Sequence, residues 1–202
     1  MFIDLLRHGE AEGTPCFRGH TDHALSKSGH QQMMTTLQDY TADVVITSPL
    51  SRCAEFAHEW SAQQNIDCHA IDDFKEINFG DWDGLMVEQI KASQQDELNL
   101  FWHDPVNFTP PNAESLVAFQ QRILTGWESL LNEHLTQDND KNILLITHGG
   151  VIRVLIAHVL SMPLNKLLSI ESPLAGMSRL RISIDEQNNR YSSLVFHAGT
   201  AS

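Results

Sequence analysis

The chain has 202 residues, of which 42% are hydrophobic and 19% charged, and it carries a formal net charge of −13. This length and composition predict one globular domain spanning residues 1–202 and argue against a disordered chain. The acidic balance disfavours nucleic acid and anionic membranes as partners, because both require a basic surface. No apolar run reaches the ~18 residues of a membrane span. Charges at Asp4 and Arg7 interrupt the first apolar run too early for a signal peptide, so a cytoplasmic location is expected.

Short β-rich runs alternate with helical patterns along the chain. The expected strands are Phe2–Leu6, Val44–Thr47, a weaker one near Asp67–Ile71, Ile143–Thr147, Leu180–Ile184 and Ser193–His197. The expected helices are Ser28–Tyr40, Ala54–Trp60, Val151–Leu160 and a long one whose apolar stripe runs from Leu116 to Leu131. This alternation predicts an α/β fold, a three-layer α/β/α sandwich with a mainly parallel central sheet. The least regular part, about 81–111, is expected to be an irregular excursion that shapes a pocket.

Three of the expected strands end in unusual polar residues. The first ends in Arg7-His8-Gly9, and a later one, "NILLITHGG", ends in His148. The second, "DVVITS", continues into "PLSR", so Ser48 is a predicted helix N-cap, with Pro49 as the first helical residue and Arg52 one turn in. Ligands of open parallel sheets bind outside the carboxyl ends of the strands. We therefore expect Arg7, His8, Arg52 and His148 to converge.

This cluster has the chemistry of a phosphate site. Two guanidinium forks and helix N-termini suit a compact dianion, above all phosphate. An imidazole adds a nucleophile that can form a covalent intermediate, and nearby arginines lower its pKa and keep its lone pair available. Glu76, in "KEINFGDWDG", is the candidate general acid, although its reference pKa of ~4.3 must rise for that role. Taken singly, His8 or His148 is more often a structural histidine, Arg52 is as often a surface charge, and Glu76 is more often a solvated loop carboxylate. The histidines and arginines together at strand ends favour function, and the "EINFGDW" context favours a role for Glu76.

Metal and thiol chemistry are not indicated. Cys16, Cys53 and Cys68 are odd in number and form no CxxC pair, so neither a disulfide framework nor a thiolate zinc site is expected. The chain has 11 histidines but no HExxH or similar ligand spacing, and we expect no metal and no cofactor. Asp138 and Asp140 are expected to lie in a solvated loop.

Four segments resemble the histidine phosphatase superfamily, which has the phosphoglycerate-mutase-like fold. They are "LLRHGE", "SPLSRCAEFA", "EINFGDWDG" and "LLITHGGVIRVLI", in the order and spacing of that family and over nearly the whole chain. The resemblance implies phosphoryl transfer to His8 followed by hydrolysis with water, without a metal. It further implies that Arg7, Arg52 and His148 form the phosphate pocket and that Glu76 donates the proton.

Within the superfamily, "FRGHTDHALSKSG", "NFGDWDG", "PPNAESLVAFQQRIL" and "SPLAGMSRLRI" are most similar to α-ribazole-5′-phosphate phosphatases, which act in cobalamin nucleotide-loop assembly. The chain departs from the family pattern at Ala11, in "EGTPC", and at Asn112-Ala113. Secondary substrate contacts are expected from Gly149, Arg18, His20, Glu114 and Ser115.

The expected partner is a small phosphorylated metabolite. The sequence does not indicate whether the protein is a monomer or an oligomer. A broad-specificity sugar phosphatase, a phosphoglycerate-mutase-like enzyme and a non-catalytic phosphate-binding module remain as alternatives.

Overall fold

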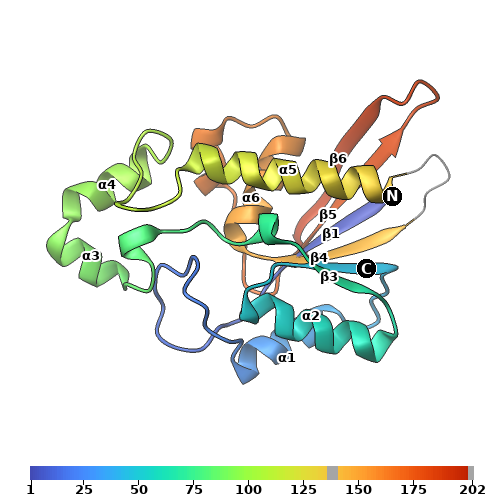
Figure 1. Cartoon of the computed structure of the whole chain (residues 1–202), viewed down its shortest axis with the longest axis horizontal. Helices are drawn as coiled ribbons and strands as arrows, with labels where there is room; N and C mark the ends of the chain where they lie inside the picture. Colours follow the sequence, from blue (N-terminus) through green and yellow to red (C-terminus); the bar gives the residue numbers. More distant parts are fainter. Residues whose placement is uncertain (136–140, 200–202) are drawn as a thin grey trace.

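One mainly parallel sheet organises the chain (Figure 1), as seen in a computed structural model that describes residues 1–135 and 141–199. Asp138 and Asp140 lie outside the described residues. The strand order is β3-β2-β4-β1-β5-β6. The bounds are β1 Phe2–Arg7, β2 Val44–Thr47, β3 Cys68–Ala70, β4 Asn142–Thr147, β5 Met177–Ile184 and β6 Arg190–Gly199. Strands β1 to β4 pair in parallel, whereas β5 and β6 join as antiparallel strands.

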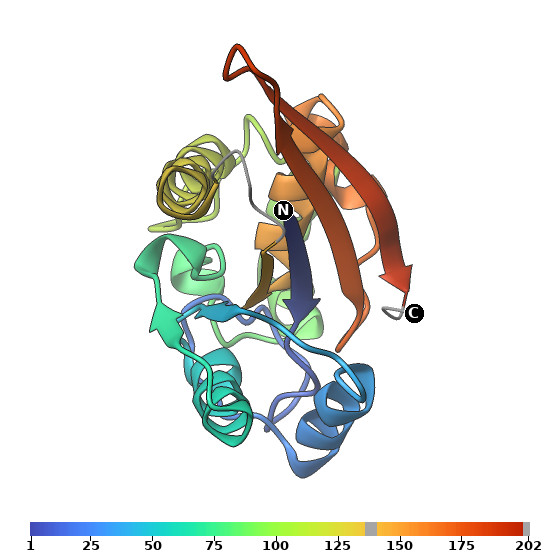
Figure 2. The ribbon, with the colours of Figure 1, turned by 90° about the vertical axis from the view of Figure 1, so that its right-hand side faces the viewer.

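Helices cover both faces of this sheet (Figure 2). Helices α1 (Lys27–Thr36) and α2 (Ser51–Gln64) lie on one side, and α5 (Leu116–His134) and α6 (Gly149–Val159) lie on the other. The predicted three-layer α/β/α sandwich is therefore confirmed. In the described part of the chain, no helix combines the length and apolarity that crossing a bilayer demands.

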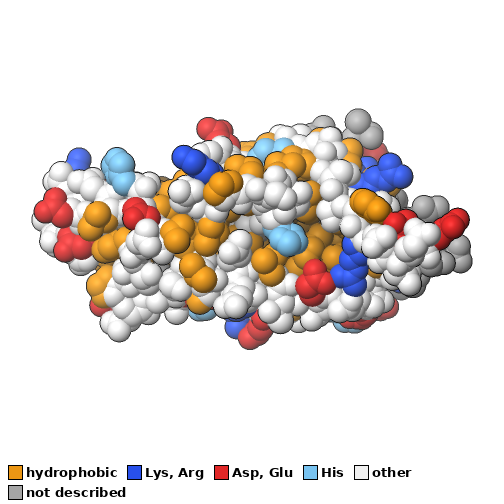
Figure 3. All heavy atoms as spheres, turned by 90° about the horizontal axis from the view of Figure 1, so that it is seen from above, with side chains coloured by type: hydrophobic (Ala, Val, Ile, Leu, Met, Phe, Trp, Pro, Cys, Tyr) orange, Lys and Arg blue, Asp and Glu red, His pale blue; other side chains and the backbone are white. Residues whose placement is uncertain are grey.

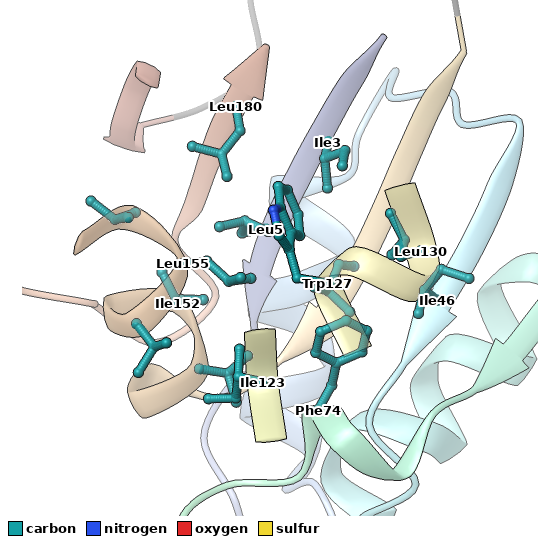
Figure 4. Packing of buried hydrophobic residues seen from close by; sticks show 14 of the residues in the cluster. Ile3, Leu5, Ile46, Phe74, Ile123, Trp127, Leu130, Ile152, Leu155 and Leu180 are labelled. Carbon is teal, nitrogen blue, oxygen red and sulfur yellow. The ribbon is translucent and has the colours of Figure 1, made fainter. Parts of the chain in front are cut away.

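Two hydrophobic cores lie on the two faces of the sheet, and the alternation of side chains along each strand explains them. In β1, Ile3 and Leu5 pack on the α5 and α6 side, whereas Leu6 packs with the α1 and α2 residues. Successive side chains of a strand point to opposite faces, so one apolar run serves both cores. The predicted stripe of α5 is buried against the sheet, and Trp127 lies at its centre beside Leu5 (Figure 4).

The start of α2 differs from the sequence-based expectation. The helix begins at Ser51 with Leu50 as its N-cap, so the prediction of Ser48 as N-cap and Pro49 as first helical residue is wrong. The hydroxyl of Ser48 lies 2.7 Å from Nε2 of His148. The same hydroxyl still accepts from the amide of Leu50 at 3.3 Å, so the local turn is kept, but the helix starts two residues later than predicted and Arg52 is its second residue.

Segment 81–111 is more regular than expected. It contains the end of the 3₁₀ helix η2 (Gly80–Trp82) and two short helices, α3 (Val87–Ser93) and α4 (Gln95–His103), at the left of Figure 1. A small core of its own holds it together: Phe17, Trp82, Ile90 and Leu98 are buried, and the Trp82 indole donates to Gln94 Oε1 at 2.8 Å. Helices α3 and α4 bury one apolar side chain each, Ile90 and Leu98, which leaves little periodic signal in the sequence.

A buried ion pair joins β1 to β5. The Asp4 carboxylate is fully buried and accepts two bonds from Arg179, at 2.8 and 2.9 Å, and one from the Tyr40 hydroxyl at 2.6 Å. We expect Arg179→Met to lower the free energy of unfolding by roughly 3 kcal/mol, because it leaves the buried Asp4 carboxylate without its positively charged partner. Urea unfolding measures the loss, with Arg181→Met on the exposed side of β5 as control. Equal stability of the two variants would contradict this role of the pair.

Candidate active site

The carboxyl ends of three neighbouring strands, β2, β4 and β1, bring the predicted cluster together. The amide of His8 donates to Thr147 O at 2.9 Å, and the amide of Ser48 donates to Ile146 O at 3.0 Å. Sequence positions 8, 48 and 148 therefore lie side by side at one edge of the sheet. His148 follows β4 directly and is the N-cap of α6, so the amino end of that helix faces the same place.

His8 is buried with one ring nitrogen fixed. Nδ1 lies 2.7 Å from the carbonyl oxygen of Gly9, and only 6% of the residue is exposed. Because a carbonyl can only accept, Nδ1 carries the proton and donates it. In the neutral ring Nε2 then holds the lone pair. The ring of His148 stands edge-on to that of His8, with centroids 5.3 Å apart.

Two guanidinium groups, one buried and one half-buried, flank the histidines. Arg52 is fully buried, and its Nη1 and Nη2 donate to the carbonyls of Thr21, at 3.1 Å, and Gly19, at 2.8 Å. Arg7 donates through Nη1 to the carbonyl of Ser172. Within the described residues, Nε of both arginines is buried without a hydrogen-bond partner. Burial lowers the pKa of both guanidinium groups, although arginine stays protonated, so the site favours an incoming anion.

Burial and positive charge keep the two histidines neutral. Burial, followed by the Arg52 charge, lowers the pKa of His8 to about 3. The same two causes, together with His8, lower the pKa of the fully buried His148 well below its usual range. The expectation that nearby arginines depress the pKa of His8 is therefore confirmed, with burial as the larger cause. A neutral imidazole keeps the Nε2 lone pair of His8 available at physiological pH.

This depression makes stability depend on pH. Below about pH 6.5 His8 is protonated in the unfolded chain but stays neutral in the folded chain. The free energy of unfolding therefore decreases as pH falls from 6.5 towards 3. Between pH 7.5 and 5.0 we expect His8→Ala to lose about 2 kcal/mol less unfolding free energy than the wild type. Urea unfolding at both values measures it, with the exposed His58→Ala as control. Equal losses in wild type and His8→Ala would contradict the neutral state.

Glu76 lies at the amino end of α6. Its Oε2 accepts from the amide of Gly150 and its Oε1 from the amide of Ile77, both at 3.0 Å. A Cβ on Gly150 would stand 2.2 Å from Oε1 of Glu76, so only glycine lets the carboxylate approach the helix end this closely. The structure thus brings Glu76 beside the cluster, as the sequence predicts.

The expected secondary contacts are placed unequally. His20 donates from Nε2 to the carbonyl of Glu76 at 2.9 Å, and Gly149 packs against the Arg7 guanidinium. The side chain of Arg18 bonds the carbonyls of Glu12 and Thr14 and the ring of His23. Its charge is nonetheless close enough to lower the pKa of His8.

The last two expected contacts lie farther along the chain. Glu114 forms an ion pair with Arg122 at 2.8 Å. Ser115 is the N-cap of α5 and accepts from Ala118 N at 3.2 Å, a helix-capping role.

An apolar cavity of about 100 Å³ adjoins this cluster. Its walls are mainly Phe79, Phe101, Phe108, Leu116, Phe119 and Leu167. Glu76, Glu114, Gly150 and Arg153 supply its polar positions, so it meets the cluster at the amino end of α6. Seen from above, apolar side chains also gather over the part of the surface where α5 and η3 (Leu164–Ser169) lie (Figure 3).

Sequence reasoning missed Arg153, which lies within the "HGGVIRVLI" segment. Its Nε donates to the carbonyl of Ile170 at 2.8 Å, and its guanidinium lies next to Gly149. Arg153 follows Gly149 by four residues in α6, so helical spacing places both on one face. That spacing was the signal available in the sequence.

The family model of the histidine phosphatase superfamily (branch 1) matches residues 3–194. The chain therefore belongs to this superfamily, and it is a phosphatase that acts on phosphate monoesters.

Its relatives differ in the substrates for which they are named. The adenosylcobalamin/alpha-ribazole phosphatase of Escherichia coli (strain K12) is 27% identical over 168 residues, 81% of either chain. Phosphoserine phosphatase 1 of Hydrogenobacter thermophilus is 26% identical over 190 residues, 92% of this chain and 87% of the relative. The crystal structure of the alpha-ribazole phosphatase from Shigella flexneri matches with a TM-score of 0.82 at 25% identity, covering 98% of this chain and 96% of that one.

Proposed function

We propose that this phosphatase works through a phosphohistidine at His8 and that its substrate is α-ribazole 5′-phosphate. The observation that supports the mechanism best is the His8 ring itself. Nδ1 donates to Gly9 and Nε2 holds the lone pair. The guanidinium groups of the buried Arg52 and the half-buried Arg7 stand beside the ring, each with an Nε that has no hydrogen-bond partner among the described residues. Plain anion binding would need the arginines but not a buried neutral imidazole.

The reaction has two steps with opposite proton movements. In the first, Nε2 of His8 attacks phosphorus, the bond to the ester oxygen breaks, and the leaving alkoxide takes a proton from Glu76. In the second, water attacks the phosphohistidine, gives a proton back to Glu76, and the phosphorus–nitrogen bond breaks to release phosphate. Arg7 and Arg52 hold the phosphoryl oxygens through both steps, and their charge stabilises the transition states.

The apolar cavity supports α-ribazole as the alcohol that leaves. It begins at Glu76, the proposed proton donor, and four phenylalanines line its walls. α-Ribazole carries an uncharged, flat aromatic base on its ribose, and such a base is stabilised by aromatic and aliphatic walls. Arg153 is the one cation among the residues that line the cavity. An alcohol bearing its own carboxylate, such as serine or glycerate, would meet two acidic side chains there.

The test compares kcat/KM for α-ribazole 5′-phosphate with that for a panel of sugar, nucleoside and amino-acid phosphates, in EDTA and with His8→Ala as control. We expect a preference of about 100-fold, which corresponds to about 2.7 kcal/mol of differential transition-state binding. A flat profile with an inactive control would favour the second candidate, a broad-specificity phosphatase. That candidate draws support from relatives of similar identity that are named for different substrates.

Phe108 offers a direct test of the cavity as the binding site for the base. We expect Phe108→Ala to raise KM for α-ribazole 5′-phosphate about 10-fold, because truncation removes aromatic contact area. The value of kcat/KM for glycerol phosphate, which has no ring to place there, is expected to change less than about two-fold. Leu100→Ala, at an exposed position on α4, is the matched control. Equal losses for both substrates would contradict this placement.

A further inference from the structure

The Asp83 carboxylate accepts hydrogen bonds from the backbone of a neighbouring loop, residues 18–21. It accepts from the amide of His20 at 2.7 Å and from the amide of Thr21 at 2.8 Å, with a longer bond from Phe79 at 3.4 Å. Burial alone would raise the pKa of Asp83, but these bonds and one from the Thr21 hydroxyl outweigh it, so the pKa lies below its usual value. Asp83 is therefore held as a carboxylate against loop 18–21.

The same loop holds Arg52 from its other side. The carbonyls of Arg18, Gly19 and Thr21 accept from the guanidinium of Arg52 at 3.3, 2.8 and 3.1 Å. All three bonds use Nη1 or Nη2, so the Nη edge of the planar group is anchored, and Nε has no partner in the described part of the chain. The loop thus sets which edge of the guanidinium is free for an anion.

One peptide group joins the carboxylate to the guanidinium. In a trans peptide the carbonyl and the N–H point in opposite directions. The Gly19–His20 peptide donates its N–H to Asp83 at 2.7 Å and offers its carbonyl to Arg52 at 2.8 Å, which are the shortest bonds on the two sides. A negative group at the N–H end and a positive group at the carbonyl end both stabilise this orientation of the peptide dipole.

The loop packs closely against its neighbours at Gly19. A Cβ on Gly19 would stand 2.2 Å from the carbonyl oxygen of Ile77 and 2.5 Å from Oδ2 of Asp83. The imidazole of His20 also donates to the carbonyl of Glu76 at 2.9 Å. Loop 18–21 is therefore pressed against the segment that carries Glu76, and Asp83 is the side chain that fixes it there.

We propose that Asp83 is a positioning residue that orients Arg52 for the phosphoryl group through the Gly19–His20 peptide. The proposal rests on the proposed function in taking Arg52 as a phosphate ligand. It also gives the second aspartate of "GDWDG" a role that the catalytic cluster does not use. Asp81, two residues earlier, is exposed, and its carboxylate accepts from Asn112 at 3.0 Å and from no other described residue, which makes it a matched control.

The experiment is a double-mutant cycle on the affinity for inorganic phosphate, measured by calorimetry on the full chain. Its members are the wild type, Asp83→Asn, Arg52→Met and the double variant, with Asp81→Asn alongside. We expect Asp83→Asn to weaken phosphate binding about 10-fold and Arg52→Met about 100-fold, and the double variant to bind as weakly as Arg52→Met alone. Asp81→Asn is expected to match the wild type.

The cycle separates the possible failures. If Asp83→Asn binds phosphate like the wild type, or if its loss simply adds to that of Arg52→Met, Asp83 does not act through Arg52 and the inference is wrong. If Arg52→Met binds phosphate like the wild type, the proposed phosphate site itself fails. Should Asp83→Asn not fold, Asp83→Glu, which keeps the charge but displaces the carboxylate, takes its place in the same cycle.

Discussion

Replacing His8 with alanine is expected to lower kcat for any phosphomonoester by about 10⁴-fold or more, because the nucleophile and the covalent route disappear together. Affinity for inorganic phosphate is expected to stay within about 10-fold of the wild type, since Arg7 and Arg52 supply the charge that binds the anion. Steady-state kinetics and calorimetry on the same preparation measure the two quantities. The result separates catalysis from binding at a single residue.

The matched control for this substitution is His58→Ala. His58 is an exposed residue of α2, so its replacement changes the same residue type away from the sheet edge and is expected to leave kcat unchanged. A His8→Ala enzyme that retained more than about 1% of wild-type kcat would contradict the nucleophilic role. A variant that also lost phosphate binding altogether would instead indicate that His8 holds the arginines in place.

Glu76→Gln is expected to have an effect that depends on the leaving group. For an alkyl ester such as a ribose 5′-phosphate, kcat is expected to fall about 10³-fold, because the alkoxide departs without a proton. For p-nitrophenyl phosphate, whose leaving group is stable as an anion, phosphorylation of His8 is expected to slow less than about 10-fold. Since water then lacks its base, the phosphoenzyme accumulates and nitrophenol appears in a burst.

Rapid-mixing kinetics measure that burst, with Glu88→Gln on the exposed side of α3 as the control. The amide of glutamine cannot accept from both Gly150 and Ile77, so one of the two bonds to the Glu76 side chain is lost. That loss affects all substrates alike. Equal reductions for alkyl and aryl esters would therefore show that Glu76 acts by position and not by proton transfer.

The sequence predicted the sheet and the site cluster because both follow from local pattern and one topological rule. Arg7, His8 and His148 end apolar runs, and the carboxyl ends of neighbouring parallel strands meet at one edge. Arg52 was predicted to join them although its helix begins at Ser51 and not at Pro49. That boundary was wrong because the backbone of Leu50 is extended, at φ −66° and ψ 136°, although Ser48 Oγ accepts from its amide as a cap would.

Other features depend on tertiary packing that single-sequence patterns do not carry. The apolar cavity draws its walls from segments near Phe79, Phe101, Leu116 and Leu167, so its existence depends on how distant loops meet. Arg153 is different, because its four-residue spacing from Gly149 in α6 was a local signal that sequence reasoning overlooked. The link from Asp83 to Arg52 runs through a backbone peptide, which has no side-chain signature.

The most direct test of the central claim is to trap the phosphoenzyme. The enzyme is mixed with substrate, quenched in alkali within milliseconds, digested and analysed by mass spectrometry for the peptide that carries the phosphoryl group. We expect the group on His8, stable in alkali and lost in acid, and absent from His8→Ala. A nitrophenol burst from the Glu76→Gln enzyme with no phosphoryl group on His8 in the same quenched sample would contradict the mechanism, because the intermediate that the burst reports would then not be a phosphohistidine at His8.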